Sequence, residues 1–351
     1  MQVIDYTPQR YEALRQFVAR TGMRLSLAHR PFVDYYYRAG DSCRLYLFLE
    51  NDETIAATFG VERMRFEHRG QELMVGFGSN FYSLRPGVGG ILFIRWLSSS
   101  AIGLVYGGSP DTHKLIRSRR WIYYTGVREY VLNDPFEPRP GERWWRIAAR
   151  AVLRRIRRAK LSEYARRIPA EIRNRLSVRE EQAYSQDLMP RESPFTFRFA
   201  PTLDHLNWRY NLRLSFVRYR LFRILDGGHT AGYVVINDSP ERLMVAHCDG
   251  TERRTLAYGV LLSVLQAGCE DREPRTVLVA STHPAMRQIY ERFGFRPKPS
   301  DRDFALGTLQ GPAEVEPDTS NWLISFDWGD NGLRPPFLDQ AAGEPERFPR
   351  L

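Results

Sequence analysis

Cysteine is scarce in this sequence of 351 residues, and long apolar runs are missing. The cysteines, Cys43, Cys248 and Cys269, are widely spaced and form no Cys-x-x-Cys pair. We therefore expect neither a disulfide framework nor a bound metal, and we expect a reducing cytoplasm. No apolar run reaches the roughly 18 residues of a membrane span. The start shows no basic region followed by an apolar one, so no secretion signal is expected.

Positive charge is concentrated in one segment. The net charge is +10, and residues 143–175 hold twelve Lys or Arg against only Glu163 and Glu171. The excess in this segment equals the charge of the whole chain, and apolar residues interspersed among the basic ones in residues 143–167 predict a basic amphipathic helix. The segment fits either a solvated linker helix or a contact with an anionic membrane surface or an acidic carrier protein. Nucleic acid is disfavoured, because no recognised binding motif accompanies the charge.

Residues 277–295 predict a strand followed by a capped helix. Residues 277–280 form a short apolar run, and Ser281 and Thr282 offer a hydroxyl cap to a helix over residues 283–293. The apolar residues of this helix share one face, and Gly294 follows where a chain leaves a helix through a left-handed residue. By residue type alone, Tyr290 on that face fits a buried aromatic side chain.

A similar pattern occurs in residues 1–136 and 195–330. In the first half, predicted strands at 44–49, 54–65 and 72–82 lead into a glycine-bearing turn, an apolar helix, a strand at 103–106 and a second helix. In the second half, the strands are predicted at 219–225, 232–237, 243–247 and 277–280. The repeat predicts an α+β fold with two mixed domains in tandem. We expect domains over 1–136 and 195–330, a basic helical linker over 137–194 and a disordered tail over 331–351.

The turn before each apolar helix suits an anion. Small residues at a helix start let a ligand approach N–H groups that have no partner inside the helix, and the helix dipole favours negative charge there. In the first half, Gly87 and Gly89 supply the small residues, and in the second half the turn is expected at residues 254–259. A pyrophosphate would fit this position.

With these features the chain resembles the GNAT superfamily of acyl-CoA-dependent acyltransferases. Members carry an Arg/Gln-x-x-Gly-x-Gly/Ala loop that holds the CoA pyrophosphate, and a later helix of the form Asn-x-x-Ala-x-x-x-Tyr-x-x-x-Gly-Phe. Residues 254–259 match the loop with Ala257 at its first glycine, and residues 282–295 match the helix with His283 at the asparagine. The resemblance implies acetyl-CoA or another acyl-CoA as co-substrate. It implies that the second half binds CoA through Arg254, Thr255, Leu256, Ala257, Tyr258, Gly259 and His283.

The same resemblance makes Tyr290 the expected acid for the departing thiolate, because a pKa near 10 suits that proton transfer. For the base, Asp249 and His247 are the candidates, since they lie at the end of the predicted strand 243–247. Glu252 is a third candidate, for which a surface charge is the favoured interpretation. His247 fits a satisfied core histidine equally well.

The first half departs from the family pattern. Leu84 occupies the Arg/Gln position of its loop, Ile116 stands where the tyrosine belongs, and Arg120 replaces the final glycine. We therefore expect a degenerate GNAT-like domain that shapes the substrate groove, although its glycines are compatible with a bound nucleotide.

Tandem chains of this kind are similar to FemAB-like and polysaccharide-cluster acyltransferases of bacteria, through residues 204–210 and the closing residues 321–327. This narrower resemblance implies an acceptor amine or hydroxyl on a small molecule, a sugar or a cell-envelope precursor. The cysteine content and the basic segment predict a place in the cytoplasm or at the inner membrane face. Two alternatives stay open: an aminoacyl transferase that uses charged tRNA, and a catalytically decayed binding protein attached to an anionic surface.

Overall fold

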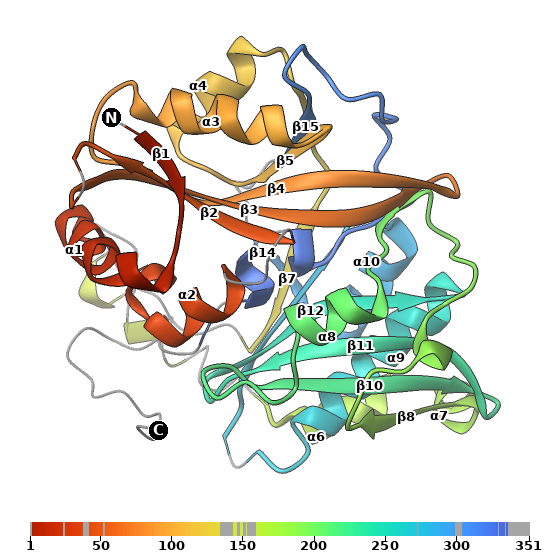
Figure 1. Cartoon of the computed structure of the whole chain (residues 1–351). Coiled ribbons are helices and arrows are strands. Elements are labelled where there is room, and N and C mark those ends of the chain that lie inside the picture. Colours follow the sequence, from red (N-terminus) through yellow and green to blue (C-terminus); the bar gives the residue numbers. More distant parts are fainter. Residues whose placement is uncertain are drawn as a thin grey trace.

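The computed structural model describes residues 2–335 apart from positions 24, 38–41, 52, 134–142, 146–147, 150–151, 153–158, 272, 299–303, 329 and 334. Two mixed sheets form its framework, and helices cover both (Figure 1). The predicted α+β fold is therefore observed. Among the described residues, no helix combines the length and apolar character needed to cross a membrane.

The first sheet has helices on both faces. Its main path runs in the order β1 (Gln2–Asp5), β2 (Cys43–Leu49), β3 (Ile55–His68), β4 (Gln71–Ser83), β5 (Ile102–Tyr106), β15 (Phe304–Gly307) and β6 (Ile122–Tyr124). On one face lie α3 (Val88–Ser99) and α4 (Pro110–Ser118), and on the other lie α1 (Tyr11–Thr21) and α2 (Arg30–Tyr36) (Figure 1). Two short strands from later in the chain, β9 (Phe197–Phe199) and β16 (Trp322–Leu323), extend the sheet beside β3.

The second sheet follows a similar plan. Its order is β14 (Arg296–Lys298), β7 (Arg128–Leu132), β13 (Thr276–Ser281), β12 (Arg242–Gly250), β11 (His229–Asp238), β10 (Tyr219–Asp226) and β8 (Leu176–Glu181). Its core is covered by α9 (Arg253–Ala267), α10 (Pro284–Phe293), α6 (Leu161–Tyr164) and α7 (Ala170–Arg175). A further helix, α8 (Leu203–Arg209), packs with α2 in a separate cluster.

The two halves exchange strands. β7 comes from the first half but pairs with β13 and β14 in the second sheet. β15 comes from the second half but pairs with β5 and β6 in the first sheet. Each half therefore completes the sheet of the other. A division of the chain at residues 136 and 195 would separate strands that pair in the same sheet. The division of the chain into two repeats describes its sequence, whereas the folded halves interlock.

The expected helix at residues 283–293 is present, but its cap differs from the prediction. α10 begins at Pro284 and ends before Gly294, whose φ of 119° is left-handed as expected. The prediction of a hydroxyl cap from Ser281 or Thr282 is wrong. Instead, the N-cap residue is His283, and its Nδ1 accepts a hydrogen bond of 3.2 Å from the Ala285 amide. The imidazole takes the place that a serine or threonine oxygen usually fills.

The expected basic linker belongs in part to the second domain. Residues 153–158 and several neighbours lie outside the described residues. Of the helix predicted over residues 143–167, the described residues 144–145, 148–149 and 152 are helical, and Leu161–Tyr164 forms α6, followed by a 3-10 turn at Ala165–Arg167 and by α7. Leu161, Ile168 and Ile172 are buried in the second core, and β8 follows as the edge strand of the second sheet. The expected tail at 331–351 also begins in packed structure, since Leu333 is buried, while residues 336–351 lie outside the description.

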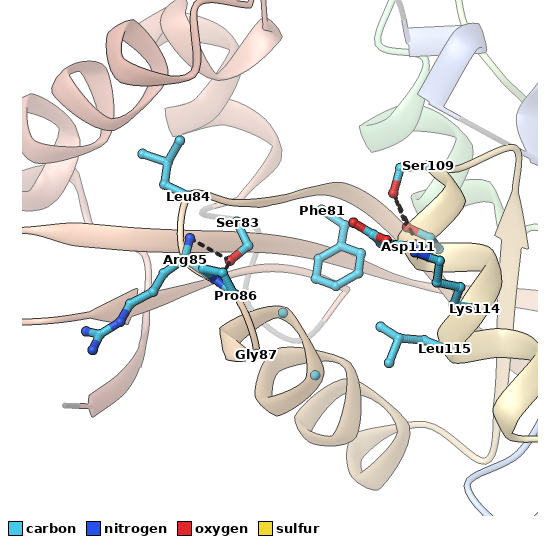
Figure 2. Close-up of a pocket in the computed structure, with 13 residues that line it drawn as sticks. Phe81, Ser83, Leu84, Arg85, Pro86, Gly87, Ser109, Asp111, Lys114 and Leu115 are labelled. Carbon is cyan, nitrogen blue, oxygen red and sulfur yellow. Dashed lines mark hydrogen bonds and ion pairs between the residues drawn. The ribbon is translucent and has the colours of Figure 1, made fainter.

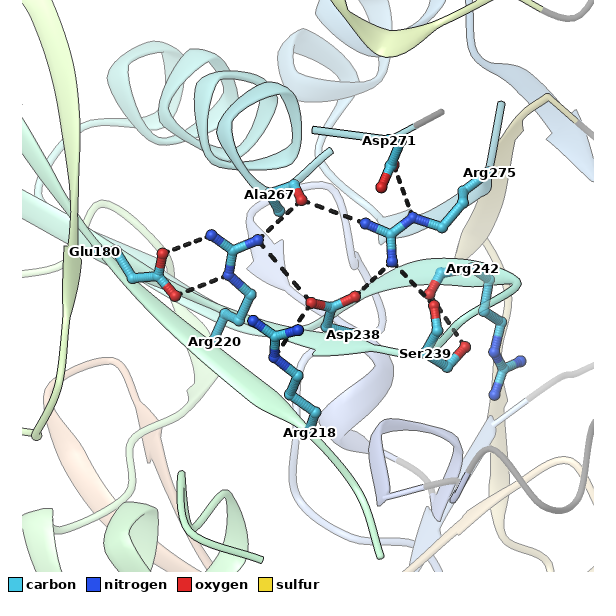
Figure 3. A network of polar contacts seen from close by, with 9 residues as sticks. All are labelled: Glu180, Arg218, Arg220, Asp238, Ser239, Arg242, Ala267, Asp271 and Arg275. Atoms are coloured by element: carbon cyan, nitrogen blue, oxygen red, sulfur yellow. Dashed lines mark hydrogen bonds and ion pairs between the residues drawn. The ribbon is translucent and has the colours of Figure 1, made fainter. Parts of the chain in front are cut away.

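A cluster of arginines fixes the C-terminal end of α9 (Figure 3). The carbonyl of Ala267 accepts hydrogen bonds from Arg220 at 2.8 Å and Arg275 at 3.3 Å. Arg275 also donates to the buried carboxylate of Asp238 at 2.5 Å. Cations at the end of a helix satisfy its last carbonyls and oppose its dipole. This cluster therefore holds α9 at the end remote from the expected ligand.

Candidate functional site: two helix starts beside open strand pairs

Each half contains a pair of parallel strands that separates toward its C-terminal end. β4 and β5 pair only from Val75 with Ile102 to Phe77 with Leu104, although β4 continues to Ser83. β12 and β13 similarly pair only over their first residues, from Arg242 with Thr276 to Met244 with Leu278. In both halves the longer strand then shifts register against its other neighbour, as at a β-bulge. The opening this leaves in each sheet lies beside a helix start.

In the first half the helix start is open. The N-cap residue of α3 is Gly87, which has a left-handed φ of 82° and no side-chain cap. A pocket of about 680 Å³ lies against this turn. It is lined by Phe81, Ser83, Leu84, Arg85, Pro86, Gly87, Gly89 and Gly90 from the end of β4 and the start of α3, and by Ser109, Asp111, Thr112, Lys114 and Leu115 from α4 and its cap (Figure 2).

The glycines of this turn differ in what they face. A Cβ atom built on Gly87 or Gly90 would meet nothing within 4 Å, so both residues border open space. A Cβ on Gly89 would lie 3.0 Å from the Phe81 ring, so this glycine allows the helix to pack on the sheet. Because the first N–H groups of a helix have no acceptor within it, a ligand can approach the backbone here.

Two cations lie at the rim of the pocket. Arg85 forms an ion pair of 3.0 Å with Glu50, and its guanidinium points away from α4 (Figure 2). Lys114 pairs with Asp111 at 2.9 Å, with both side chains mostly exposed. Exposed pairs of this kind contribute little to stability, so either cation can turn to a more strongly charged ligand. Together with the helix dipole, they make this pocket suitable for a phosphate group.

In the second half the helix start is occupied by the protein itself. α9 begins at Arg253, and its N-cap residue is Glu252. The Glu252 carboxylate accepts hydrogen bonds from the amides of Arg254 at 2.9 Å and Thr255 at 2.5 Å. Burial favours a raised pKa for Glu252, but these amide bonds outweigh it and the pKa is lowered. A carboxylate therefore already fills the position at which a pyrophosphate would bind.

The expected loop at residues 254–259 is helical, which corrects the prediction of a turn there. α3 begins at residue 88 and α9 at residue 253, so the helix starts are 165 residues apart. The glycines that close the two expected turns, Gly89 and Gly259, are 170 residues apart. Gly259 consequently lies in the second turn of α9. Leu256 and Ala257 are fully buried, and Tyr258 is mostly buried. The binding of CoA by residues 254–259 stays a prediction, and this geometry does not favour it.

Gly259 has a packing role. A Cβ atom there would lie 2.6 Å from Cγ1 and 2.9 Å from Cγ2 of Ile224, which is 0% exposed. The glycine lets α9 lie directly on β10. His283 is likewise engaged within the protein, since it caps α10 and its ring meets Phe195 edge to face at 6.0 Å. Burial, and then the charge of Arg253, lower the pKa of His283.

Tyr290 lies in the core of the second half. Its side chain is 1% exposed and belongs to the same apolar cluster as Cys248, Phe195 and Leu323. Burial, followed by the proximity of Cys248, raises the pKa of Tyr290 well above its ordinary value. The hydroxyl is therefore protonated at neutral pH, as an acid must be, but a donor molecule would have to displace packed side chains to reach it.

The two candidate bases belong to a buried polar network between the halves. His247 lies 2.8 Å from the Tyr233 hydroxyl through Nε2 and pairs with Asp327 through Nδ1. Asp249 is ion paired with Arg198, which also reaches Glu67 of β3 at 2.8 Å. Burial raises the pKa of Asp249, although the charge of Arg198 opposes it. These contacts join the first sheet to the second and favour a structural role, while catalysis by either residue stays a prediction.

The motif match favours the second half, whereas the helix caps favour the first half as the site of an anion. The available signal was the charge at the helix start. Gly87-Val88-Gly89-Gly90 leaves the first turn of α3 without side chains that could cap it, whereas Glu252 stands directly before α9. An acidic residue at an N-cap competes with an anionic ligand for the same amides.

Comparison with known proteins places the fold. No protein family and no curated protein matches the sequence. Among solved structures, a tandem GNAT protein from the clavulanic acid biosynthesis pathway matches with a TM-score of 0.55 and 12% identity, over 89% of this chain and 99% of that one. A GCN5-related N-acetyltransferase from Kribbella flavida matches with a TM-score of 0.54 and 14% identity, over 88% of this chain and 72% of that one.

The N-myristoyltransferase of Saccharomyces cerevisiae, solved with bound myristoyl-CoA, matches with a TM-score of 0.51 and 9% identity, over 87% of this chain and 81% of that one. At such identities the likeness concerns the fold alone. The narrower FemAB-like resemblance is not shown by these neighbours and stays a prediction. The expectation of GNAT-like domains in tandem is confirmed, and the chain has a fold similar to that of a tandem GNAT protein.

Proposed function

We propose that this protein is an acyl-CoA-dependent acyltransferase whose donor site lies in the first half. The pyrophosphate of the donor would bind at the open start of α3, between Gly87 and Gly90, with Arg85 and Lys114 at the rim. Its pantetheine arm would then extend into the opening between β4 and β5. The fold supports the class of reaction, and the pocket supports the location.

One observation carries this proposal: the two repeats differ at the helix start. α3 has a glycine cap that leaves its amides accessible, and a pocket of about 680 Å³ lies beside it. α9 has a carboxylate on the equivalent amides. Because an anionic ligand and Glu252 need the same N–H groups, only the first half is ready to bind a pyrophosphate without rearrangement.

The reaction is a direct transfer. The acceptor amine or hydroxyl attacks the thioester carbonyl, the carbon–sulfur bond breaks, and the acceptor's proton ends on the thiol of CoA. Thiols titrate near pH 8.5, so the thiolate is a competent leaving group even where no tyrosine is at hand. The absence of a tyrosine at Ile116 is therefore compatible with catalysis in the first half. Acceptors such as a sugar or a cell-envelope precursor, and transfer from charged tRNA, stay predictions.

The test uses acetyl-CoA as the probe and two matched variants. Gly90→Asp places a carboxylate in the first turn of α3, and Arg254→Asp does the same at an exposed position in the first turn of α9. We expect acetyl-CoA to raise the melting temperature of the wild type and of Arg254→Asp, and to have no effect on Gly90→Asp. Loss of binding in Arg254→Asp alone would move the donor site to the second half. No binding by the wild type would refute the proposed function.

A further inference from the structure

A buried carboxylate lies on the strand that crosses from the first half into the second sheet. Glu129, in β7, is 6% exposed and accepts a hydrogen bond of 3.1 Å from the hydroxyl of Tyr106. Tyr106 is the last residue of β5. The pair thus joins the open end of the first sheet to a strand of the second sheet.

This pair lies close along the chain to the donor pocket. Ser109, which lines the pocket, follows Tyr106 by three residues, a span of at most about 10 Å. The opening between β4 and β5 begins after Leu104 pairs with Phe77. Tyr106 therefore borders the gap through which the arm of a donor bound at α3 would pass.

The pair and the pocket lie on opposite faces of the first sheet. Side chains alternate along β5: Val105 packs with Trp96 of α3, whereas Leu104 and Tyr106 pack on the other face. The pocket is on the face covered by α3 and α4, and Glu129 meets Tyr106 on the face turned toward the second sheet. A donor that enters from one face and an acceptor that enters from the other would meet at this gap.

We propose that Glu129 is the general base of the transfer and that Tyr106 positions it. This inference rests on the proposed function, because it assumes a thioester in the first half. Glu129 would take the proton from the acceptor as its nitrogen or oxygen attacks the thioester carbonyl. As the carbon–sulfur bond breaks, the protonated carboxyl returns that proton to the thiolate. The products are the acylated acceptor and free CoA, and Glu129 is again ionised.

The exchange of strands gives this assignment a physical reason. β7 carries Tyr130 on the opposite face, where its hydroxyl lies 2.9 Å from Glu291 of α10. The strand is therefore fixed from both sides, and its position does not depend on the first half alone. A base on a strand that is paired on both sides is held more rigidly than one on a loop. The second half would then serve the reaction by supplying the strand partners that place Glu129.

Placement is tested by affinity labelling of the full chain, which needs no knowledge of the acceptor. Chloroacetyl-CoA in the donor site alkylates a nearby thiol, with chloride as the leaving group. We expect Glu129→Cys to be labelled at least about tenfold faster than the native exposed Cys269, with acetyl-CoA protecting it. Arg128→Cys is the matched control, because the adjacent residue points to the other face of β7. Tyr106→Cys provides a second reporter if Glu129→Cys fails to fold.

The outcomes separate the two proposals. Labelling at 129 and 106 no faster than at Cys269, in a protein whose melting temperature rises with acetyl-CoA, overturns the assignment of Glu129 and leaves the donor site intact. Equal labelling at 128 and 129 also overturns it. For the base role, hydrolysis of acetyl-CoA, in which water accepts the acetyl group and the CoA thiol is released, should fall about a hundredfold or more in Glu129→Gln while acetyl-CoA binding is kept. Unchanged release in this variant refutes the role.

Discussion

Gly90 and Gly259 predict opposite responses to the same substitution. Gly90 is the third residue of α3 and borders open space, whereas Gly259 is the seventh residue of α9 and faces Ile224. Replacing a helical glycine by alanine stabilises a helix by roughly 0.5–1 kcal/mol where space allows. We therefore expect Gly90→Ala to raise the free energy of unfolding by that amount.

At Gly259 the steric cost outweighs this gain. The new methyl group would overlap the side chain of Ile224, which is fully buried and has no room to move. Overpacking of this kind costs typically about 1–3 kcal/mol, so the net loss should be up to about 2 kcal/mol. For a chain of this size each kcal/mol corresponds to roughly 1–2 °C in melting temperature. The two variants should move in opposite directions in a thermal or urea unfolding experiment.

The affinity for acetyl-CoA should distinguish the variants in the opposite way: Gly90→Ala should weaken binding, and Gly259→Ala should not. The methyl group of Gly90→Ala enters the space beside the first amides of α3, and we expect the Kd for acetyl-CoA to rise about tenfold or more, equivalent to at least about 1.4 kcal/mol. Gly259→Ala should keep the wild-type Kd in the fraction that remains folded. Calorimetric titration measures both. The reasoning is refuted if Gly90→Ala binds normally while Gly259→Ala keeps its stability and loses affinity.

Three further outcomes are expected. Glu252→Gln should lower the free energy of unfolding by about 1 kcal/mol at neutral pH through loss of the N-cap. Because the pKa of Glu252 is lowered in the folded state, the difference in stability from wild type should shrink as the pH falls through that pKa. Urea unfolding at several pH values can check this. Tyr290→Phe should keep both acetyl-CoA binding and thiol release, and a loss of release with binding intact would return the acid role to Tyr290. Arg198→Met should destabilise the protein by about 3–5 kcal/mol, because it leaves the buried Asp249 without its ion pair. A loss below about 1 kcal/mol in chemical unfolding would contradict the assigned role of that pair.

The order of strands and helices could be read from sequence because it depends on local patterns. The alternation of apolar residues in residues 219–247 indicates strands, and the spacing of apolar residues around Tyr290 indicates a helix. α10 ends at Gly294 because a left-handed residue is needed there, and that requirement is visible in the sequence. Its cap differs from the expected one, because a histidine with a correctly placed ring nitrogen can replace the hydroxyl that sequence rules favour.

The candidate site could not be ranked from sequence in the same way. A motif match favoured residues 254–259, yet these residues are helical and partly buried against Ile224. The match fails because caps set where a helix starts. The helix starts of the two repeats are five residues closer together than the motif glycines, so every position of the motif at 254–259 lies inside α9. The weaker match in the first half retains the physical requirement, which is an open helix start with no side chain over it.

By itself, the sequence determined the mixed α+β character, the repeat and the glycine-bearing start of α3, because each follows from neighbouring residues. Only the tertiary structure decided that β7 and β15 change places, that Glu252 covers the second helix start, and that Glu129 meets Tyr106. Those contacts join residues far apart in the chain. Their partners are chosen by packing between the sheets, and no local pattern encodes that choice.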